Sequence, residues 1–98
     1  MRQDIRITRI EAAPGATIAK RPSYPSGTVF AFPVVYTLAD GTQVTGTESA
    51  RLKRDAVAAL AALPREPRNM SACFDDTGAF WGTSTVYGPL STLPGRTP

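Results

Sequence analysis

The chain has 98 residues, a formal net charge of +3, no histidine and a single cysteine, with 42% hydrophobic and 19% charged residues. This length and composition suit one globular domain, and the single cysteine excludes an internal disulfide. Without histidine, the histidine-based catalytic triads and the common zinc sites are also excluded.

No hydrophobic run approaches the ~20 residues of a membrane-spanning helix. The first ten residues alternate charged and apolar side chains, so we expect no signal peptide. We therefore expect a cytoplasmic protein without membrane association, cofactor or metal. Arginine and alanine are plentiful whereas lysine occurs only at Lys20 and Lys53, a bias typical of a GC-rich bacterial genome or one of its phages.

Residues 3–10 place Ile5 and Ile7 in alternation with polar side chains, which predicts a half-buried strand. Residues 11–27 hold three prolines and two glycines without a regular period, so we expect a long loop. In this loop Tyr24 lies between prolines, close to Lys20 and Arg21, and these three residues are candidate partner contacts. The open alternative is that the tyrosine ring packs the loop onto the domain.

Residues 28–38 predict the main strand. Every second residue along it is apolar, and these residues share one face: Phe30, Phe32, Val34, Tyr36 and Leu38. Pro33 cannot donate a backbone hydrogen bond, so we expect it at an edge or a bulge. A three-residue loop at 39–41, with Gly41 left-handed, pairs Tyr36 with Val44 and keeps the apolar residues together. We predict this register rather than that of a two-residue Asp40-Gly41 turn.

A helical period follows, with an apolar stripe formed by Leu52, Ala56, Ala59, Leu60 and Leu63. We predict Ser49 or Thr47 as the N-cap and Pro64 as the end of the helix. Arg51 and Arg54 fall on the opposite face, where basic residues of the first turn oppose the helix dipole. They are candidate partner contacts, with a solvated helix face as the open alternative.

After an extended linker at 64–69, residues 70–74 and 79–87 predict a second hairpin. In its turn we expect Gly78 to have a positive φ and Asp76 to accept hydrogen bonds from the backbone. If the loop consists of the three residues Asp76, Thr77 and Gly78, Phe74 pairs with Phe80 and Cys73 pairs with Trp81 across the two strands. Residues 1–87 are thus predicted to form a single domain, and 88–98 a flexible tail.

Together these elements predict an α+β fold, in which a small antiparallel sheet of about four to five strands (two hairpins plus an N-terminal strand) packs against one α-helix. Residues 34–63 distantly resemble the sheet-plus-helix DNA-binding domains at the N-termini of phage-type integrases. That resemblance implies DNA binding by the exposed sheet face. Because residues 28–47 contain no Arg or Lys, we expect any nucleic acid to contact the first strand, the loop or the helix instead.

The triplet Asp76-Thr77-Gly78 resembles the catalytic loop of aspartic proteases, in which two such loops bring two aspartates together. That family requires a flap hairpin and a later apolar-apolar-Gly element after the triplet. Here only 20 residues follow Gly78, and Asp75 stands where the family has an apolar residue. A hairpin turn accounts better for the triplet, so we expect no catalytic residue and keep a protease as the remote alternative.

We therefore expect a non-enzymatic interaction protein that binds and occludes a surface of a protein or nucleoprotein partner. A phage or mobile-element accessory factor, such as an anti-CRISPR-like inhibitor of a bacterial defence complex, would have this size and would need no catalytic residues. The alternative is a small basic DNA- or RNA-binding protein, and a homodimer also stays open. The candidate partner-binding residues are Arg6, Lys20, Arg21, Tyr24, Arg51 and Arg54.

Overall fold

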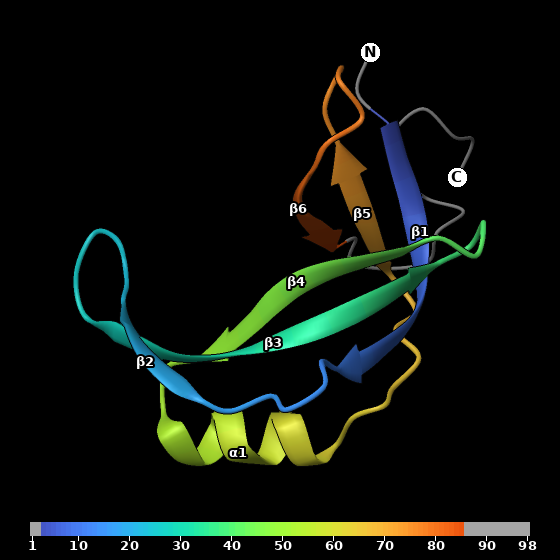
Figure 1. Cartoon of the computed structure of the whole chain (residues 1–98). Helices are drawn as coiled ribbons and strands as arrows, with labels where there is room; N and C mark the ends of the chain where they lie inside the picture. Colours follow the sequence, from blue (N-terminus) through green and yellow to red (C-terminus); the bar gives the residue numbers. More distant parts are fainter. Residues whose placement is uncertain (1–2, 86–98) are drawn as a thin grey trace.

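The computed structural model describes residues 3–85, which form six strands and one helix (Figure 1). The elements are β1 (Gln3–Ala12), β2 (Ala19–Pro22), β3 (Thr28–Leu38), β4 (Gln43–Ala50), α1 (Lys53–Ala61), β5 (Met70–Phe74) and β6 (Phe80–Thr85). The predicted α+β class is confirmed, since a small antiparallel sheet packs against a single helix. The predicted tail at 88–98 lies outside the described residues. Within residues 3–85 no helix has the length and apolar character needed to cross a membrane.

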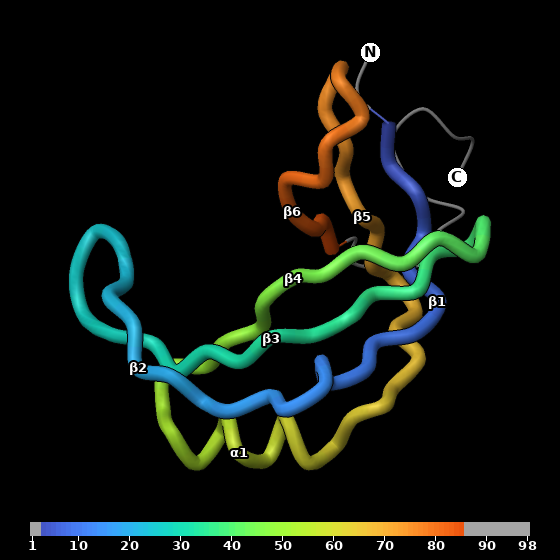
Figure 2. Tube along the Cα trace, in the orientation of Figure 1, coloured from blue at the N-terminus to red at the C-terminus, as the bar shows by residue number. Residues whose placement is uncertain are grey.

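β3 lies at the centre of the sheet. β4 pairs with one of its edges, whereas β1 and β2 pair with successive parts of the other edge. β1 is shared, because its second half pairs with β3 and its first half pairs with β5, which in turn pairs with β6. The β5–β6 hairpin therefore rises beside one end of β3 and β4, while α1 packs beneath the other end (Figures 1 and 2).

The core lies on the face of β3 that the sequence predicts to be buried. Phe32, Val34, Tyr36 and Leu38 are each 1% exposed or less, and Phe30 is partly buried. They pack against Ile7, Ile10, Ala56 and Ala72, from β1, α1 and β5. Burying a large apolar side chain contributes about 1.5–3 kcal/mol to folding, so this layer is the main source of stability.

The predicted three-residue turn between β3 and β4 is confirmed. Gly41 has φ 88°, the Leu38 amide donates to the Thr42 carbonyl at 2.8 Å, and Tyr36 pairs with Val44. Asp40 accepts a hydrogen bond from the Thr42 amide at 2.9 Å, which holds the pKa of its carboxyl below the ordinary value. The register is therefore the one that keeps the apolar residues of both strands on the core side.

Pro33 lies in the central strand, not at the predicted edge or bulge. Its carbonyl accepts a hydrogen bond from the Ala13 amide at 3.1 Å. In an antiparallel strand the nitrogen and oxygen of one residue point to the same side, so the missing donor also faces this edge. Here β1 has ended at Ala12 and β2 starts only at Ala19. The neighbouring ladder is interrupted where Pro33 has no hydrogen to donate.

The predicted loop at 11–27 is wrong in two places, because β1 continues to Ala12 and residues Ala19–Pro22 form β2. All four residues of β2 are exposed, so this strand leaves no hydrophobic period in the sequence. It is held instead by backbone pairing with β3 and by a turn in which the Ser23 amide donates to the Gly27 carbonyl at 3.0 Å. β2 adds a sixth strand to the four or five predicted.

The predicted helix start is also wrong. Thr47 and Ser49 belong to β4, whose pairing with β3 continues to Ala50 and keeps the backbone extended. α1 begins only at Lys53, with Leu52 at the N-cap and no side-chain cap. Leu52, predicted on the buried stripe, is therefore 47% exposed. Ala56 is fully buried as predicted, and Ala59, Leu60 and Leu63 are partly buried against the core.

β4 has one unpaired edge within residues 3–85, because it pairs only with β3. The bond between the Leu38 amide and the Thr42 carbonyl fixes which pairs are hydrogen-bonded, and every second residue of β4 then points its amide towards β3. We expect the amides of Gly46 and Glu48 to exchange slowly with deuterium and those of Thr45 and Thr47 to exchange fast, as measured by NMR. Equal protection of both sets in dilute solution would contradict this register. Protection of Thr45 and Thr47 that grows with protein concentration would show a second copy pairing along β4.

Candidate interaction surfaces

Five of the basic side chains gather at one end of the sheet, which we call the basic end: Lys20, Arg21, Arg51, Lys53 and Arg54. Strand register brings them together, because Lys20 pairs with Phe30 of β3 and Phe30 pairs with Ala50 of β4. The end of β4 and the start of α1 thus lie at the same end of the sheet as β2, across β3 from it, as Figures 1 and 2 show. All five side chains are exposed, and neither ion pair of the described residues uses any of them.

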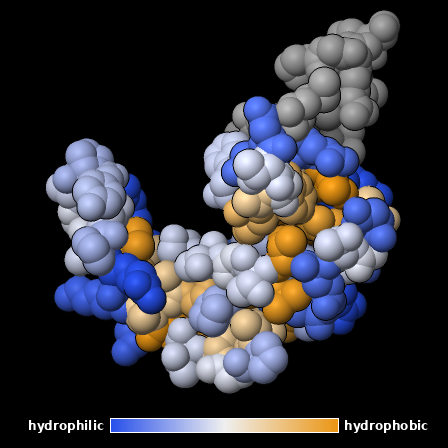
Figure 3. All heavy atoms as spheres, turned by 45° about the horizontal axis from the view of Figure 1, so that its top comes forward, coloured by the Kyte–Doolittle hydropathy of each residue, from blue (hydrophilic) through white to orange (hydrophobic). Residues whose placement is uncertain are grey.

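Tyr24 stands at the tip of the loop between β2 and β3. Its side chain is 93% exposed, so the ring does not pack the loop onto the domain. Figure 3 shows this loop as one arm of a hollow whose other arm is the β5–β6 hairpin, with strongly hydrophilic side chains at the base of the loop arm. Of the six predicted partner contacts, four thus belong to the basic end: Lys20, Arg21, Arg51 and Arg54. A fifth, Tyr24, projects beside them.

Arg6, the sixth predicted contact, lies apart from the basic end and in a second basic surface. Two adjoining depressions follow the linker between α1 and β5, with volumes of about 320 and 520 Å³, and Glu66 lines both of them. Arg9 and Arg65 line the smaller depression, and Arg6 and Arg68 line the larger one. We call the two depressions together the arginine groove.

A bulge in β1 places two arginines in this groove. Ile7 pairs with Leu38 but Arg9 pairs with Thr37, so Thr8 is an extra residue that shifts the alternation of the strand. Ile7 and Ile10 are consequently both fully buried, and Arg6 and Arg9 are both exposed. A strict period of two would have put Arg6 and Arg9 on opposite faces, which is why sequence reasoning did not group them.

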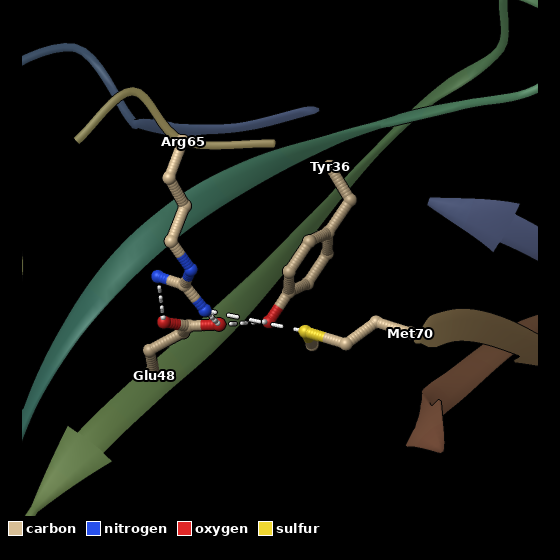
Figure 4. Close-up of polar contacts among 4 residues, drawn as sticks. All are labelled: Tyr36, Glu48, Arg65 and Met70. Carbon is tan, nitrogen blue, oxygen red and sulfur yellow. Dashed lines mark hydrogen bonds and ion pairs between the residues drawn. The ribbon is translucent and has the colours of Figure 1, made fainter. Parts of the chain in front are cut away.

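The linker wall of the groove is anchored by Arg65. Its backbone exchanges two hydrogen bonds with Ile10, at 2.9 and 3.0 Å, and its guanidinium binds both carboxylate oxygens of Glu48 on β4, at 3.0 and 3.1 Å. Figure 4 shows this pair between β4 and the linker, with the Tyr36 hydroxyl 3.5 Å from Glu48 and the Met70 sulfur 4.0 Å from Arg65. A bidentate, partly buried ion pair of this kind fixes orientation as well as adding stability.

Tyr36 makes this cluster sensitive to alkaline pH. Burial raises its pKa to about 12, and the charge of Glu48 and the hydrogen bond to it add to the rise, while Arg65 opposes it. The unfolded chain loses this proton near pH 10, so we expect the free energy of unfolding to fall between pH 10 and about 12. Denaturant titrations across this range measure the loss. If Tyr36→Phe shows the same fall, ionisation of Tyr36 is not its cause.

The stretch at 74–80 is a hairpin turn, as predicted, with Gly78 at φ 84° and Phe74 paired with Phe80. Asp75 is a side-chain acceptor in this turn, which the sequence analysis did not single out. One oxygen of Asp75 accepts from the Thr77 hydroxyl and the Thr77 and Ala79 amides at 2.6, 2.9 and 3.0 Å, and these bonds, that of the Thr77 hydroxyl first, lower the pKa of Asp75. Asp75 stands first in an Asx turn, a position from which an aspartate side chain reaches the amides that follow it.

Trp81 does not pair with Cys73 as predicted. Cys73 pairs with Gly82, because a bulge in β6 inserts Trp81 and turns its ring outward, where it is 55% exposed. Cys73 itself is fully buried.

Among residues 3–85, no three side chains of histidine, cysteine, aspartate or glutamate lie close enough to hold a metal ion. The candidate sites among the described residues are thus the basic end with Tyr24 and the arginine groove. No protein-family model, curated protein or solved structure matches this chain, so a functional proposal has to rest on the chemistry of these surfaces.

Proposed function

We propose that this chain is a non-enzymatic binding protein that occupies an anionic surface of a protein or nucleoprotein partner through the basic end and Tyr24. The observation that carries the proposal is the gathering of five exposed cations from β2, from Arg51 directly after β4 and from α1, near the 93% exposed Tyr24. None of the five takes part in an ion pair among residues 3–85. Arginine and tyrosine are enriched among the residues that dominate binding energy at protein interfaces.

The unfavourable placement of charge at the start of α1 also supports this proposal. Lys53 and Arg54 lie in the first turn, where cations oppose the helix dipole, and the N-cap offers no side-chain hydrogen bond to offset them. Each such cation costs some tenths of a kcal/mol, and an anionic partner would reverse the sign of this contribution. In the cytoplasm of a bacterial cell, such docking fits an accessory factor of a phage or mobile element that inhibits a defence complex by covering its working surface.

The test is affinity capture from a bacterial lysate with and without nuclease, using the wild type and matched charge reversals. We expect a discrete partner that the wild type retains after nuclease, that the double variant Lys20→Glu/Arg21→Glu loses, and that Arg6→Glu/Arg68→Glu keeps. The two double variants change the net charge equally, so net charge cannot explain a difference between them. Equal capture by all three proteins would overturn the proposal. Loss of the partner on nuclease treatment would overturn direct docking on a protein surface.

Tyr24→Ala tests the aromatic part of the contact. Because the ring is 93% exposed, we expect the melting temperature to stay unchanged while affinity for the captured partner falls about tenfold or more. Surface plasmon resonance against the purified partner measures the affinity, and Trp81→Ala is the control for an exposed aromatic residue on the other arm. An unchanged affinity for Tyr24→Ala would remove the tyrosine from the proposed contact.

A further inference from the structure

The arginine groove lies over an opening in the sheet. β1 pairs with β5 as far as Arg6, opposite Ser71, and meets the linker again only where Ile10 bridges Arg65. Between these two points residues 7–9 and residues 66–70 do not pair with each other. The two segments of the chain separate here, and residues from both segments line the depressions.

The charges of the groove are divided between two walls. Arg9 pairs with the exposed Glu11 at 3.2 Å, and Arg65 is held by Glu48 at 3.0 Å. Arg6 on β1 and Arg68 on the linker have no ion-pair partner among the described residues, and both line the larger depression. Two arginines therefore line one concave space, one from β1 and one from the linker, and Glu66 is the single acidic residue among the described residues of the lining.

We propose that the arginine groove binds the phosphodiester backbone of a nucleic acid, with Arg6 and Arg68 holding phosphate from the two walls. Among residues 3–85 the lining contains arginine and no lysine, and the planar guanidinium fork matches the geometry of phosphate oxygens. An elongated site made of two joined depressions suits a chain of phosphates. This site is separate from the basic end and does not depend on the function proposed above.

The lining also sets the kind of recognition. It consists of arginine, threonine, glutamate and proline, and it offers no aromatic ring on which a base could stack. Binding through backbone phosphates alone carries no sequence information, so affinity depends on salt and not on base sequence. A polypeptide ligand fits less well, because the described lining residues other than Pro64 and Pro67 are charged or polar.

The test is fluorescence anisotropy with a labelled single-stranded oligothymidine and a labelled duplex of equal length at about 50 mM salt. We expect Arg6→Gln/Arg68→Gln to weaken binding about tenfold or more and to reduce the slope of log affinity against log salt by about two. Glu66→Gln removes the acidic group from the lining and is expected to tighten binding. Arg51→Gln/Arg54→Gln removes the same charge from the basic end, which is itself cationic, and is expected to weaken binding by a clearly smaller factor than the groove pair does, as a comparison at equal net charge.

The measurements separate phosphate binding by the arginine groove from diffuse attraction and from binding of acidic peptides. Equal weakening by the two arginine pairs would show diffuse attraction by net charge and would overturn it, as would the absence of binding by the wild type. Competition by polyglutamate as effective as by unlabelled oligonucleotide would show that the groove takes acidic peptides instead. A preference for single strand or for duplex identifies which nucleic acid the groove accepts. Because these probes need no cellular partner, failure here leaves the docking proposal for the basic end intact.

Discussion

Replacing Gly46 by alanine is expected to lower the free energy of unfolding by about 1–3 kcal/mol. A Cβ at this position would overlap Cε2 of the Tyr36 ring and would lie 3.1 Å from Cδ2. The ring has little room to yield, because Tyr36 is 1% exposed and its ring centre lies 6.2 Å from that of Phe80. Gly46 therefore leaves the space that the Tyr36 ring occupies, and Tyr36 is the largest fully buried side chain among the described residues. Chemical denaturation of both proteins measures the difference.

Gly82→Ala is the matched control for a glycine within a strand. No atom lies within 4 Å of the Cβ position at Gly82, and its φ is not positive, so we expect a neutral or slightly stabilising effect. The cause can also be tested directly with Tyr36→Leu, which removes the ring. In that background Gly46→Ala should cost much less, and an undiminished cost would show that contact with the tyrosine ring is not the source.

The elements that bury hydrophobic residues could be predicted from the sequence. The alternation in β3 and the glycine at position 41 fixed the first hairpin and its register, because a shift by one residue would expose the apolar face. The second hairpin was predictable for the same reason, with Phe74 opposite Phe80. The bulges at Thr8 and Trp81 could not be predicted, because an inserted residue shifts the alternation and no particular residue type marks its position in the sequence.

The candidate surfaces were only partly predictable. Tyr24 and its basic neighbours could be found because an aromatic residue among prolines stands out locally. That Lys20 and Arg51 share one end of the sheet depends on β2, whose pairing is made by backbone atoms and leaves no side-chain pattern. The arginine groove needed both the bulge in β1 and the Ile10–Arg65 bridge, which joins residues far apart in the chain. Contacts between distant segments are the part that local patterns do not encode.

Arg65→Met is expected to destabilise the protein by about 2 kcal/mol. The methionine keeps an apolar stem but leaves the Glu48 carboxylate, whose side chain is 17% exposed, without its cation. A fully buried pair would cost more, but the Arg65 side chain is 39% exposed, which reduces the expected loss. Denaturant titration measures the global effect. Hydrogen exchange at the Ile10 amide, which donates to the Arg65 carbonyl, reports whether the linker also detaches locally.

Two comparisons separate this ion pair from a general effect of charge. Arg9→Met removes the same group from a pair whose side chains are 45% and 42% exposed, and it should change stability by no more than about 0.5 kcal/mol. The double variant Glu48→Gln/Arg65→Met should cost less than the sum of the single variants, because no buried charge is left alone. Additive costs would mean that Glu48 and Arg65 are not coupled. In that case the backbone bridge to Ile10 would hold the linker by itself, and the groove would keep its shape without the ion pair.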